Sequence, residues 1–258
     1  MALQLSGKRV LVTAGAAGIG RSIVDLCVAA GARLQVCDID GDALAALAGD
    51  HPEVGTSLCD VSDRAAVDRL FDELEARLGG LDVLVNNAGI AGPTKSVEEI
   101  TDEEWGQTLA VNITGQFYCA RRAVPLLKAA GGGAIVNLSS AAGRFGYPLR
   151  SPYAASKWAV VGFSHTLAAE LGTHKIRVNA ILPGPVAGER IDRVIRAKAE
   201  QRGISEQAMR DDYLKMTAMR EFVTAEDVAG TVLYLLSDAG ARVSGQAIGV
   251  DAATQYIG

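Results

Sequence analysis

Tyr153 and Lys157 lie four residues apart in the segment SPYAASK, and together they could carry out proton transfer. The segment is predicted to be helical, so this spacing places the two side chains on one face, one turn apart. An ammonium group beside a phenol favours the phenolate and lowers the tyrosine pKa from about 10 towards neutrality. Such a tyrosine could exchange a proton with an alcohol or a ketone at about pH 7.

The same pair has a plain structural interpretation, an amphipathic helix with a surface lysine and a half-buried tyrosine. Tyr–Lys pairs at this spacing are common, so the pair alone does not establish catalysis. Ser140 adds a third group, because it ends a predicted strand in NLSSAAG, thirteen residues before Tyr153. Its hydroxyl could hydrogen-bond the same substrate oxygen.

A glycine-rich turn, AGAAGIG, follows an apolar strand and opens a helix near the N-terminus. Gly15, Gly18 and Gly20 would let a pyrophosphate approach the backbone without a Cβ in the way. The N–H groups and the dipole of the helix that follows favour an anion there. A tight strand-to-helix connection without a ligand is the alternative interpretation of the turn taken alone.

Asp38 closes the next predicted strand, about 20 residues after the turn, where an acid can accept hydrogen bonds from the adenosine ribose. Its carboxylate would repel a 2′-phosphate. Because neither the turn nor the positions just after Asp38 carry an arginine or lysine, the sequence favours NAD over NADP. A simple turn residue remains the alternative for a single aspartate.

The pair Asn86–Asn87 in VNNAG ends another apolar run. Buried asparagine side chains are costly unless they are hydrogen-bonded. They are therefore expected to brace the sheet edge and the loop beside a cofactor, although an ordinary turn would also explain them.

Strands and helices alternate along the whole chain. Strands are expected at 8–14, 33–40, 54–61, 81–89, 132–140, 176–184 and 245–251, and helices at 20–32, 41–49, 63–79, 102–130, 151–172 and 224–238. Helix 102–130 should start at an N-cap, Thr101, and be kinked by Pro125. Residues 188–221 are charged and expected to be helical. The predicted fold is α/β: one domain over 1–258, a Rossmann-type doubly wound parallel sheet with helices on both faces.

The composition narrows the function classes. A net charge of −5 spread over 258 residues argues against nucleic acid or an anionic membrane as the main partner. No apolar run reaches the roughly 20 residues of a membrane helix, and we see no signal peptide. The four cysteines match no metal-ligand spacing and indicate reduced thiols in a cytoplasmic protein.

Taken in order, these motifs resemble those of the short-chain dehydrogenase/reductase family over nearly the whole chain. The family's T-G-x-x-x-G-x-G motif is matched by Thr13, Gly18 and Gly20. The other matching positions are Asp38, the pair Asp60–Val61, the N-N-A-G motif from Asn86 to Gly89, Asn112 in AVNITG, Ser140, Tyr153, Lys157, and the pair Pro183–Gly184.

The resemblance implies that Tyr153 takes the proton of a substrate hydroxyl or gives one to a carbonyl, while Ser140 orients that oxygen. Lys157 would hold the nicotinamide ribose and lower the pKa of Tyr153, and Asn112 would position a water linking Lys157 to solvent. The implied cofactor is NAD, which exchanges a hydride with the substrate carbon. The expected cofactor contacts are Gly15, Gly18, Ile19, Gly20, Asp38, Ile39, Asp60, Val61, Asn87, Ala88, Gly89, Tyr153, Lys157, Pro183, Gly184 and Val186. No metal is expected.

The family also suggests a homotetramer whose interfaces come from helices 102–130 and 151–172. Three positions depart from its pattern. Ala14 replaces the first glycine of the turn, which leaves open whether Ala14 or Gly15 takes the unusual backbone angle. Gly188 stands where a threonine often binds the nicotinamide carboxamide, and VDAATQ follows the last strand where V-D-G-G is common.

The substrate is expected to contact residues 141–150 and the variable stretch 186–220. Candidate pocket residues are Arg144, Phe145, Tyr147, Arg150, Glu189, Arg190 and Arg193. The arginines motivate a polar or anionic substrate, such as a sugar or hydroxy acid derivative, whereas a solvated helix face would also explain most of the charges. The rival hypotheses are an NADPH-dependent 3-oxoacyl-thioester reductase of the same family, against which Asp38 argues, and a non-catalytic NAD-binding regulator.

Overall fold

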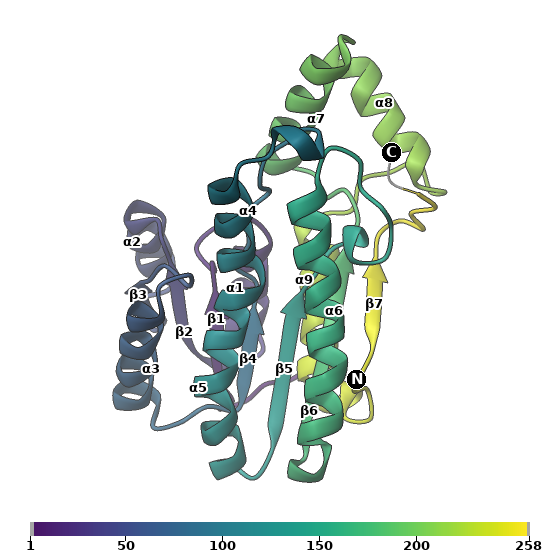
Figure 1. The fold of residues 1–258 in the computed structure, drawn as a ribbon. Helices are drawn as coiled ribbons and strands as arrows, with labels where there is room; N and C mark the ends of the chain where they lie inside the picture. The colour runs from purple at the N-terminus through teal and green to yellow at the C-terminus, as the bar shows by residue number, and fades with distance from the viewer. Residues whose placement is uncertain (1–2, 257–258) are drawn as a thin grey trace.

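The computed structural model describes residues 3–256, and its centre is a seven-stranded sheet in which all neighbouring strands are parallel (Figure 1). The strands are β1 Arg9–Thr13, β2 Arg33–Asp38, β3 Gly55–Leu58, β4 Val83–Asn86, β5 Gly133–Leu138, β6 Ile176–Pro183 and β7 Ala247–Val250. Their order is β3-β2-β1-β4-β5-β6-β7, so the direction of winding reverses between β1 and β4. Ligands of such sheets bind beyond the carboxyl ends of the strands, at this reversal.

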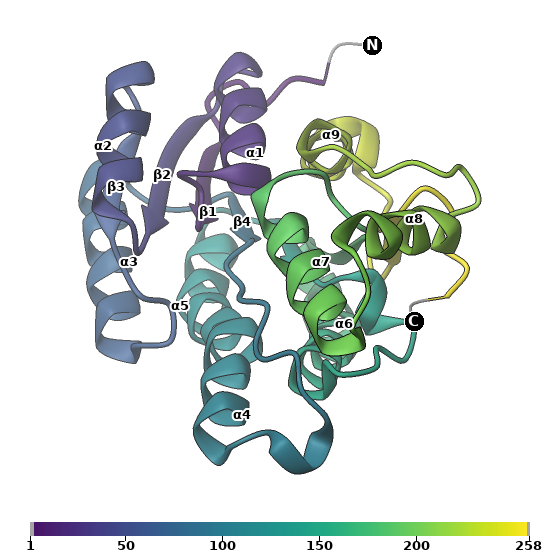
Figure 2. The same cartoon turned by 90° about the horizontal axis from the view of Figure 1, so that it is seen from above.

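Helices cover both faces of the sheet, as the apolar runs predicted. Apart from the two helices of residues 188–221, the α-helices are α1 Gly18–Ala29, α2 Gly41–Asp50, α3 Arg64–Leu78, α4 Asp102–Leu109, α5 Gly115–Ala129, α6 Ser151–Leu171 and α9 Ala225–Leu236. One core cluster joins α1, α2 and α9 to Val10 and Val12 of β1, and the other joins α3 and α5 to Leu11. Figure 2 shows α1 and α9 on one side of the sheet and α5 and α6 on the other.

The predicted single helix over 102–130 is wrong in its middle. Its start is as expected, because Thr101 caps α4 with a capping box that includes Glu104. A π-helical turn, Ala110–Thr114, then separates α4 from α5. The chain stays helical through Pro125, so the interruption falls more than a turn before the proline. Such π turns often occur at functional sites.

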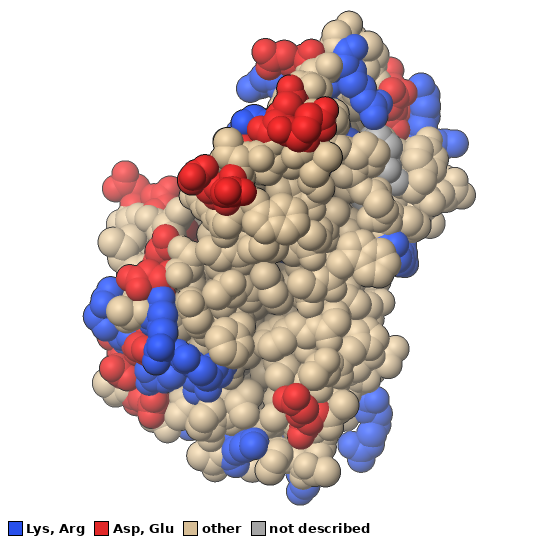
Figure 3. Space-filling model, viewed as in Figure 1, with Lys and Arg blue, Asp and Glu red and all other residues tan. Residues whose placement is uncertain are grey.

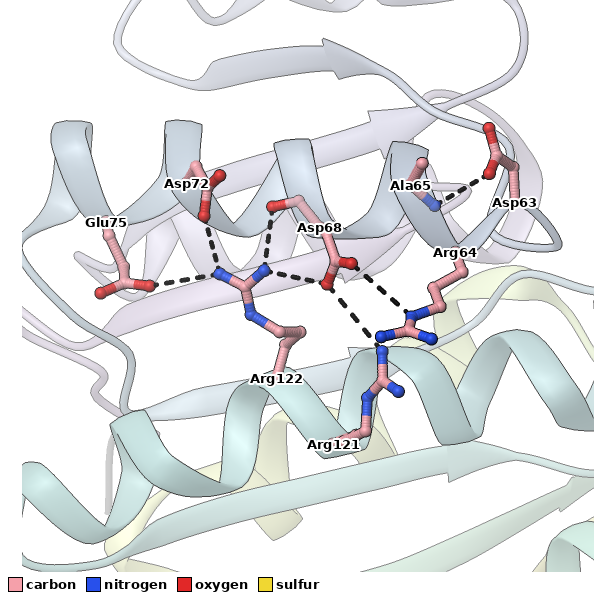
Figure 4. Close-up of polar contacts among 8 residues, drawn as sticks. All are labelled: Asp63, Arg64, Ala65, Asp68, Asp72, Glu75, Arg121 and Arg122. Atoms are coloured by element: carbon pink, nitrogen blue, oxygen red, sulfur yellow. Dashed lines mark hydrogen bonds and ion pairs between the residues drawn. The ribbon is translucent and has the colours of Figure 1, made fainter.

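Helices α3 and α5 are joined by a set of ion pairs, which we call the α3–α5 seam (Figure 4). Arg122 on α5 lies 2.9 Å from Asp68, 2.8 Å from Asp72 and 3.6 Å from Glu75. The hydrogen bond from Arg122 lowers the pKa of Asp68. The guanidinium also lies over the Phe71 ring, 5.6 Å from its centre, so the cation is matched by acids on one side and by a ring on the other.

Residues 188–221 form two helices, α7 Glu189–Arg202 and α8 Glu206–Met216, which lie above the carboxyl edge of the sheet (Figure 1). They have a small apolar cluster of their own, which includes Ile195, Met209 and Tyr213. This pair of helices therefore packs as a cover over the site instead of adding to the two sheet-side cores. Within residues 3–256, no helix has the length and the apolar character needed to cross a bilayer.

Candidate active site

The glycine turn follows β1 and leads into α1. Ala14, not Gly15, has a left-handed backbone angle, with φ 49°. Gly18, farther along the turn, also has a positive φ, 53°. Gly15 is required for space instead, since a Cβ there would lie 2.6 Å from Val36 Cγ1. Gly20 is equally restricted, because a Cβ would lie 2.7 Å from Asn87 Nδ2. The sequence left open which of the two residues takes the unusual angle, and in the structure Ala14 adopts it despite its Cβ.

The N-terminus of α1 fits a pyrophosphate. Its N-cap residue, Ala17, offers no side-chain hydrogen bond, and its first turn contains no acid. The first N–H groups of a helix have no partner within the helix, so an anion can accept from them. A Cβ on Gly18 would meet no atom within 4 Å, which leaves the approach to these groups open. Ile19 lies in the same turn and packs partly against the core.

Asp38 and Asp60 lie at the ends of neighbouring strands. The Asp38 carboxylate accepts from the backbone N–H of Ala16 at 3.1 Å and of Ile39 at 2.8 Å, which fixes it between the glycine turn and β2. Asp60 accepts from the N–H and the hydroxyl of Ser62. The Ile39 side chain is 69% exposed, so an apolar surface lies next to the fixed Asp38 carboxylate. The ribose hydroxyls of an adenosine could donate to such carboxylate oxygens, and its base could pack against the apolar side chain.

The N-N-A-G segment is held by Thr13. The threonine hydroxyl accepts from the backbone N–H groups of Asn87 and Ala88, both at 3.0 Å, and Asn87 Nδ2 donates to the carbonyl of Ala14 at 2.9 Å. Asn86 is buried and donates to Asn137 Oδ1 on β5 at 2.9 Å. These bonds tie the loop after β4 to the glycine turn and to the adjacent strand.

Asn112 lies in the π turn and is fully buried. Its Oδ1 accepts from Ile90 N at 2.7 Å, and its Nδ2 donates to Ile90 O at 3.0 Å and to Ser156 Oγ at 3.0 Å. A Cβ on Gly89 would lie 3.2 Å from Asn112 Oδ1 and 3.3 Å from Lys157 Nζ, so these two polar groups flank Gly89. Asn112, for which a water-positioning role was predicted, fixes the loop beside Lys157 in this structure.

The two serines after β5 have different partners. Ser139 is buried and donates to the carbonyl of Lys157 at 2.7 Å, so it braces the start of α6. The Ser140 hydroxyl accepts from Ala142 N at 3.1 Å and lies near the Tyr153 phenol, whose pKa it helps to lower. Ser140, the residue chosen from the thirteen-residue spacing, is therefore the serine that contacts the tyrosine.

Tyr153 and Lys157 lie together on α6. Lys157 is 3% exposed, and its Nζ lies 5.7 Å from the centre of the Tyr153 ring and donates to Leu138 O at 2.9 Å. Burial raises the pKa of Tyr153, but the charges of Lys157 and Arg190 and the Ser140 hydrogen bond outweigh it and lower the pKa to about 8. Burial also lowers the pKa of Lys157 to about 8. Both groups change charge near neutral pH, as proton transfer requires.

The segment after β6 closes the other side of the site. Pro183 ends β6, and Gly184 donates its N–H to Val250 O at 2.9 Å, so the turn is fixed against β7. Val186 pairs with Val223 in an isolated bridge. Gly188 has φ 129° and is the N-cap of α7. This backbone angle suits glycine, which gives a conformational reason for the absence of a threonine there.

Comparisons with known proteins agree with this geometry. A family model described as Enoyl-(Acyl carrier protein) reductase matches residues 14–253. The chain is 35% identical over 250 residues to a 2,5-dichloro-2,5-cyclohexadiene-1,4-diol dehydrogenase of Sphingobium indicum, covering 96% of both chains. The chain belongs to the short-chain dehydrogenase/reductase family.

Two further relatives support the same assignment. D-threitol dehydrogenase of Mycolicibacterium smegmatis is 35% identical over 252 residues, covering 96% of this chain and 93% of the relative. Carveol dehydrogenase from Mycobacterium avium, solved in complex with NAD, has a TM-score of 0.90 and 30% identity, covering 96% of this chain and 98% of the other. The predicted family and the predicted fold are confirmed, and this short-chain dehydrogenase/reductase is an oxidoreductase.

On the substrate side of this short-chain dehydrogenase/reductase, several of the charged candidate residues fit the alternative of a solvated surface. Glu189 and Arg193 pair with each other at the surface, where their side chains are 93% and 67% exposed. Arg144 pairs with Asp251 at 2.6 Å, and its guanidinium lies over Phe145. The charges of these residues are thus matched by neighbouring side chains of the chain itself.

Two residues on the cover were missed from the sequence. Lys198 is fully buried, with Nζ 4.4 Å from the centre of the Tyr147 ring, and Tyr213 places its hydroxyl 2.6 Å from that of Tyr147. A signal for Lys198 was available, because it continues the spacing of the buried Ile191 and Ile195 along α7. A lysine in the apolar phase of a helix indicates a buried cation.

Proposed function

We propose that this chain is an NAD-dependent dehydrogenase that interconverts a secondary alcohol and a ketone by hydride transfer, with NAD preferred over NADP. Ser140, Tyr153, Lys157 and Asn112 form its catalytic set. The substrate is a polar or anionic small molecule, such as a sugar or hydroxy acid derivative. The observation that carries the proposal is a tyrosine that lies beside a serine, with a buried lysine 5.7 Å from its ring centre, and whose pKa is lowered to about 8.

In the direction of oxidation, the Tyr153 phenolate accepts the proton of the substrate hydroxyl. Ser140 donates a hydrogen bond to the same oxygen and holds it beside the phenol. Lys157, in its charged form, lies next to the ring and stabilises the phenolate. When bound, the nicotinamide supplies the hydride chemistry, accepting from the alcohol carbon or donating to the carbonyl carbon. In reduction, the phenol returns its proton to the oxygen.

The preference for NAD is supported by the charges around Asp38. Its carboxylate is fixed at the end of β2, where a 2′-phosphate would meet a like charge. Arg21 follows the glycine turn, but its guanidinium is occupied by Asp25 at 2.7 Å and Asp50 at 2.8 Å. We expect NAD to bind more tightly than NADP, and equal or tighter binding of NADP would instead support the thioester-reductase alternative.

The decisive variant is Tyr153→Phe, which keeps the ring and removes the proton carrier. Loss of a general acid–base group is expected to lower kcat by about 10²- to 10⁴-fold. Binding of NAD, measured by calorimetry, should remain within about threefold, because the phenol is one of many cofactor contacts. Tyr234→Phe is the matched control, since Tyr234 lies partly exposed on α9, on the other side of the sheet.

Three outcomes separate the alternatives. Turnover of secondary alcohols with NAD that vanishes in Tyr153→Phe supports the proposal. Appreciable turnover by Tyr153→Phe contradicts the assigned mechanism. Tight NAD binding by the wild type without turnover on a broad panel of alcohols and ketones indicates a non-catalytic NAD-binding regulator.

A homotetramer is also part of the proposal. Figure 3 shows a broad face over α5 and α6 on which charged side chains are sparse and gather at the edges. Phe117 and Trp158 on these helices are 44% and 51% exposed. Burial of such a face between copies would remove apolar surface from water. Sedimentation analysis tests the oligomeric state.

A cytoplasmic location is a further part of the proposal. The four cysteines are buried and form no disulfide, which suits a reducing compartment such as the cytoplasm.

A further inference from the structure

Arg150 directly precedes α6 and is only 2% exposed, although it carries a guanidinium group. The group lies near two rings, 5.0 Å from the centre of Tyr153 and 5.2 Å from the centre of Tyr147. Its charge also contributes to lowering the pKa of Tyr153. A buried cation therefore lies close enough to the Tyr153 phenol for one small molecule to contact both groups.

The hydrogen-bonding capacity of Arg150 is mostly unused. Nη2 donates to the carbonyl of Ala91, but Nε and Nη1 are buried and have no hydrogen-bond partner. Ring stacking does not replace those bonds, because the N–H groups lie in the plane of the guanidinium and need acceptors. A buried donor without a partner is costly, and more so when it is charged.

No acidic side chain of residues 3–256 forms an ion pair with Arg150. Three acids of the cover and the sheet edge have other partners: Asp251 with Arg144, Glu189 with Arg193, and Asp192 with Arg210. The charges that act on Tyr153 and Lys157 from the cover are also positive, with Arg190 as the principal one. The pocket thus carries an excess of positive charge before any ligand enters.

We infer that Arg150 binds a carboxylate of the substrate, so that the enzyme acts on hydroxy acids and their oxo acids. This inference rests on the proposed function and gives it a substrate class. A carboxylate is acceptor-only and forms short, charge-assisted hydrogen bonds with guanidinium N–H groups. It would partner Nε or Nη1 and neutralise the buried charge, while the hydroxyl of the same molecule lies at Tyr153 and Ser140.

The test compares each hydroxy acid with its own neutral amide. The 2-, 3- and 4-hydroxypentanoates and their primary amides are assayed with NAD, using the wild type, Arg150→Met and Arg150→Lys. The best acid should exceed its amide in kcat/KM by about tenfold or more. Arg150→Met should lower the acid-to-amide ratio of kcat/KM by about 10- to 100-fold, the range of a charge-assisted hydrogen bond, whereas the loss of its charge near Tyr153 should change turnover of the acid and of the amide alike. Arg150→Lys keeps the charge and should retain part of the acid preference.

A second readout needs no substrate. Butyrate should inhibit the NAD-bound wild type competitively against the alcohol, and should also bind in calorimetry, whereas butyramide should not. Arg150→Met should lose butyrate binding while it keeps its affinity for NAD. Arg196→Met is the control, because this substitution also removes one positive charge. The Arg196 side chain lies on α7, is 64% exposed and pairs with Glu206.

The outcomes distinguish this inference from the proposed function. If neutral alcohols are oxidised as well as acids, and Arg150→Met changes both alike, Arg150 is a packing residue hydrated by water and only the inference fails. If no alcohol is oxidised by the wild type, the proposed function fails, and the butyrate measurement still decides whether Arg150 binds a carboxylate. If Arg150→Met does not fold, Arg150→Lys and butyrate binding to the wild type decide.

Discussion

Arginines occur together in two regions of this molecule, and the two regions differ in whether the arginine is paired with acids. In the α3–α5 seam, Arg122 has three acidic neighbours and is partly exposed to solvent. In the pocket, Arg150 is buried beside Tyr153 and two of its nitrogens have no partner. The seam thus pairs charges that are partly exposed, whereas the site around Tyr153 leaves a buried charge unmatched by any acid of the described residues.

The pocket departs from local preferences in its backbone as well. Ala14 holds a left-handed angle, and the π turn that carries Asn112 interrupts a helix. Strained backbone and unmatched charge persist only where the surrounding structure holds them, and they gather at functional sites. The seam, where each group is paired, serves packing between helices.

The largest expected effect tests whether the positive charge in the pocket is catalytic. Lys157→Met removes the cation, so the pKa of Tyr153 should rise above its present value of about 8, because burial then acts with less opposition. The oxidation rate of the wild type should increase as pH rises through about 8, where the phenolate forms, and the reduction rate should fall.

In Lys157→Met the rise of the oxidation rate should move to higher pH, and kcat at pH 7.5 should fall by about 10²- to 10⁴-fold. A pH–rate profile of oxidation measures both effects. An unchanged profile in the variant would show that Lys157 does not set the tyrosine pKa.

A smaller effect is expected in the seam. Arg122→Met removes a partly exposed cation, and pairs of this kind contribute little to stability, so thermal unfolding should shift down by no more than about 4 °C. The pH–rate profile should stay that of the wild type. A change in kcat comparable to that of Lys157→Met would break the distinction between the two regions.

The smallest effect concerns strain in the glycine turn. Ala14→Gly relieves a left-handed angle that costs an L-residue about 1–2 kcal/mol, partly offset by the added flexibility of glycine. The melting temperature without NAD should therefore rise by roughly 1–3 °C. Gly18→Ala, at φ 53°, is the converse and should lower both stability and NAD affinity. A lower melting temperature for Ala14→Gly would show that Ala14 is not strained.

The sheet and the cofactor side were predictable because their signals are local. Apolar runs gave the strands, Thr101 gave a helix start, and the spacing of Tyr153 and Lys157 placed them on one face. The π turn was not predictable, since a one-residue change of helical period has no signature in composition. It coincides with a tight approach, where a Cβ on Gly115 would lie 2.9 Å from Val61 Cγ2.

The substrate side was less accessible to sequence reasoning. Arg150 and Arg193 are the same residue type in two charged stretches, and only the packing of α7 and the neighbouring rings makes one buried and the other exposed. Likewise, the sequence left open whether Ala14 or Gly15 takes the left-handed angle, and the structure assigns it to Ala14, while Val36 leaves no room for a side chain at position 15. Such outcomes depend on contacts between distant segments.

The bonds of Asn112 give it the behaviour of a substitute peptide group. Its amide donates to and accepts from Ile90, as the next strand of a ladder would, where β4 has already ended. The following residue, Ala91, is held by Arg150, and Lys95 donates its N–H to Leu149. The loop after β4 is thus tethered from two sides, by Asn112 and by Arg150, so a change in the orientation of Arg150 would act directly on the backbone of this loop.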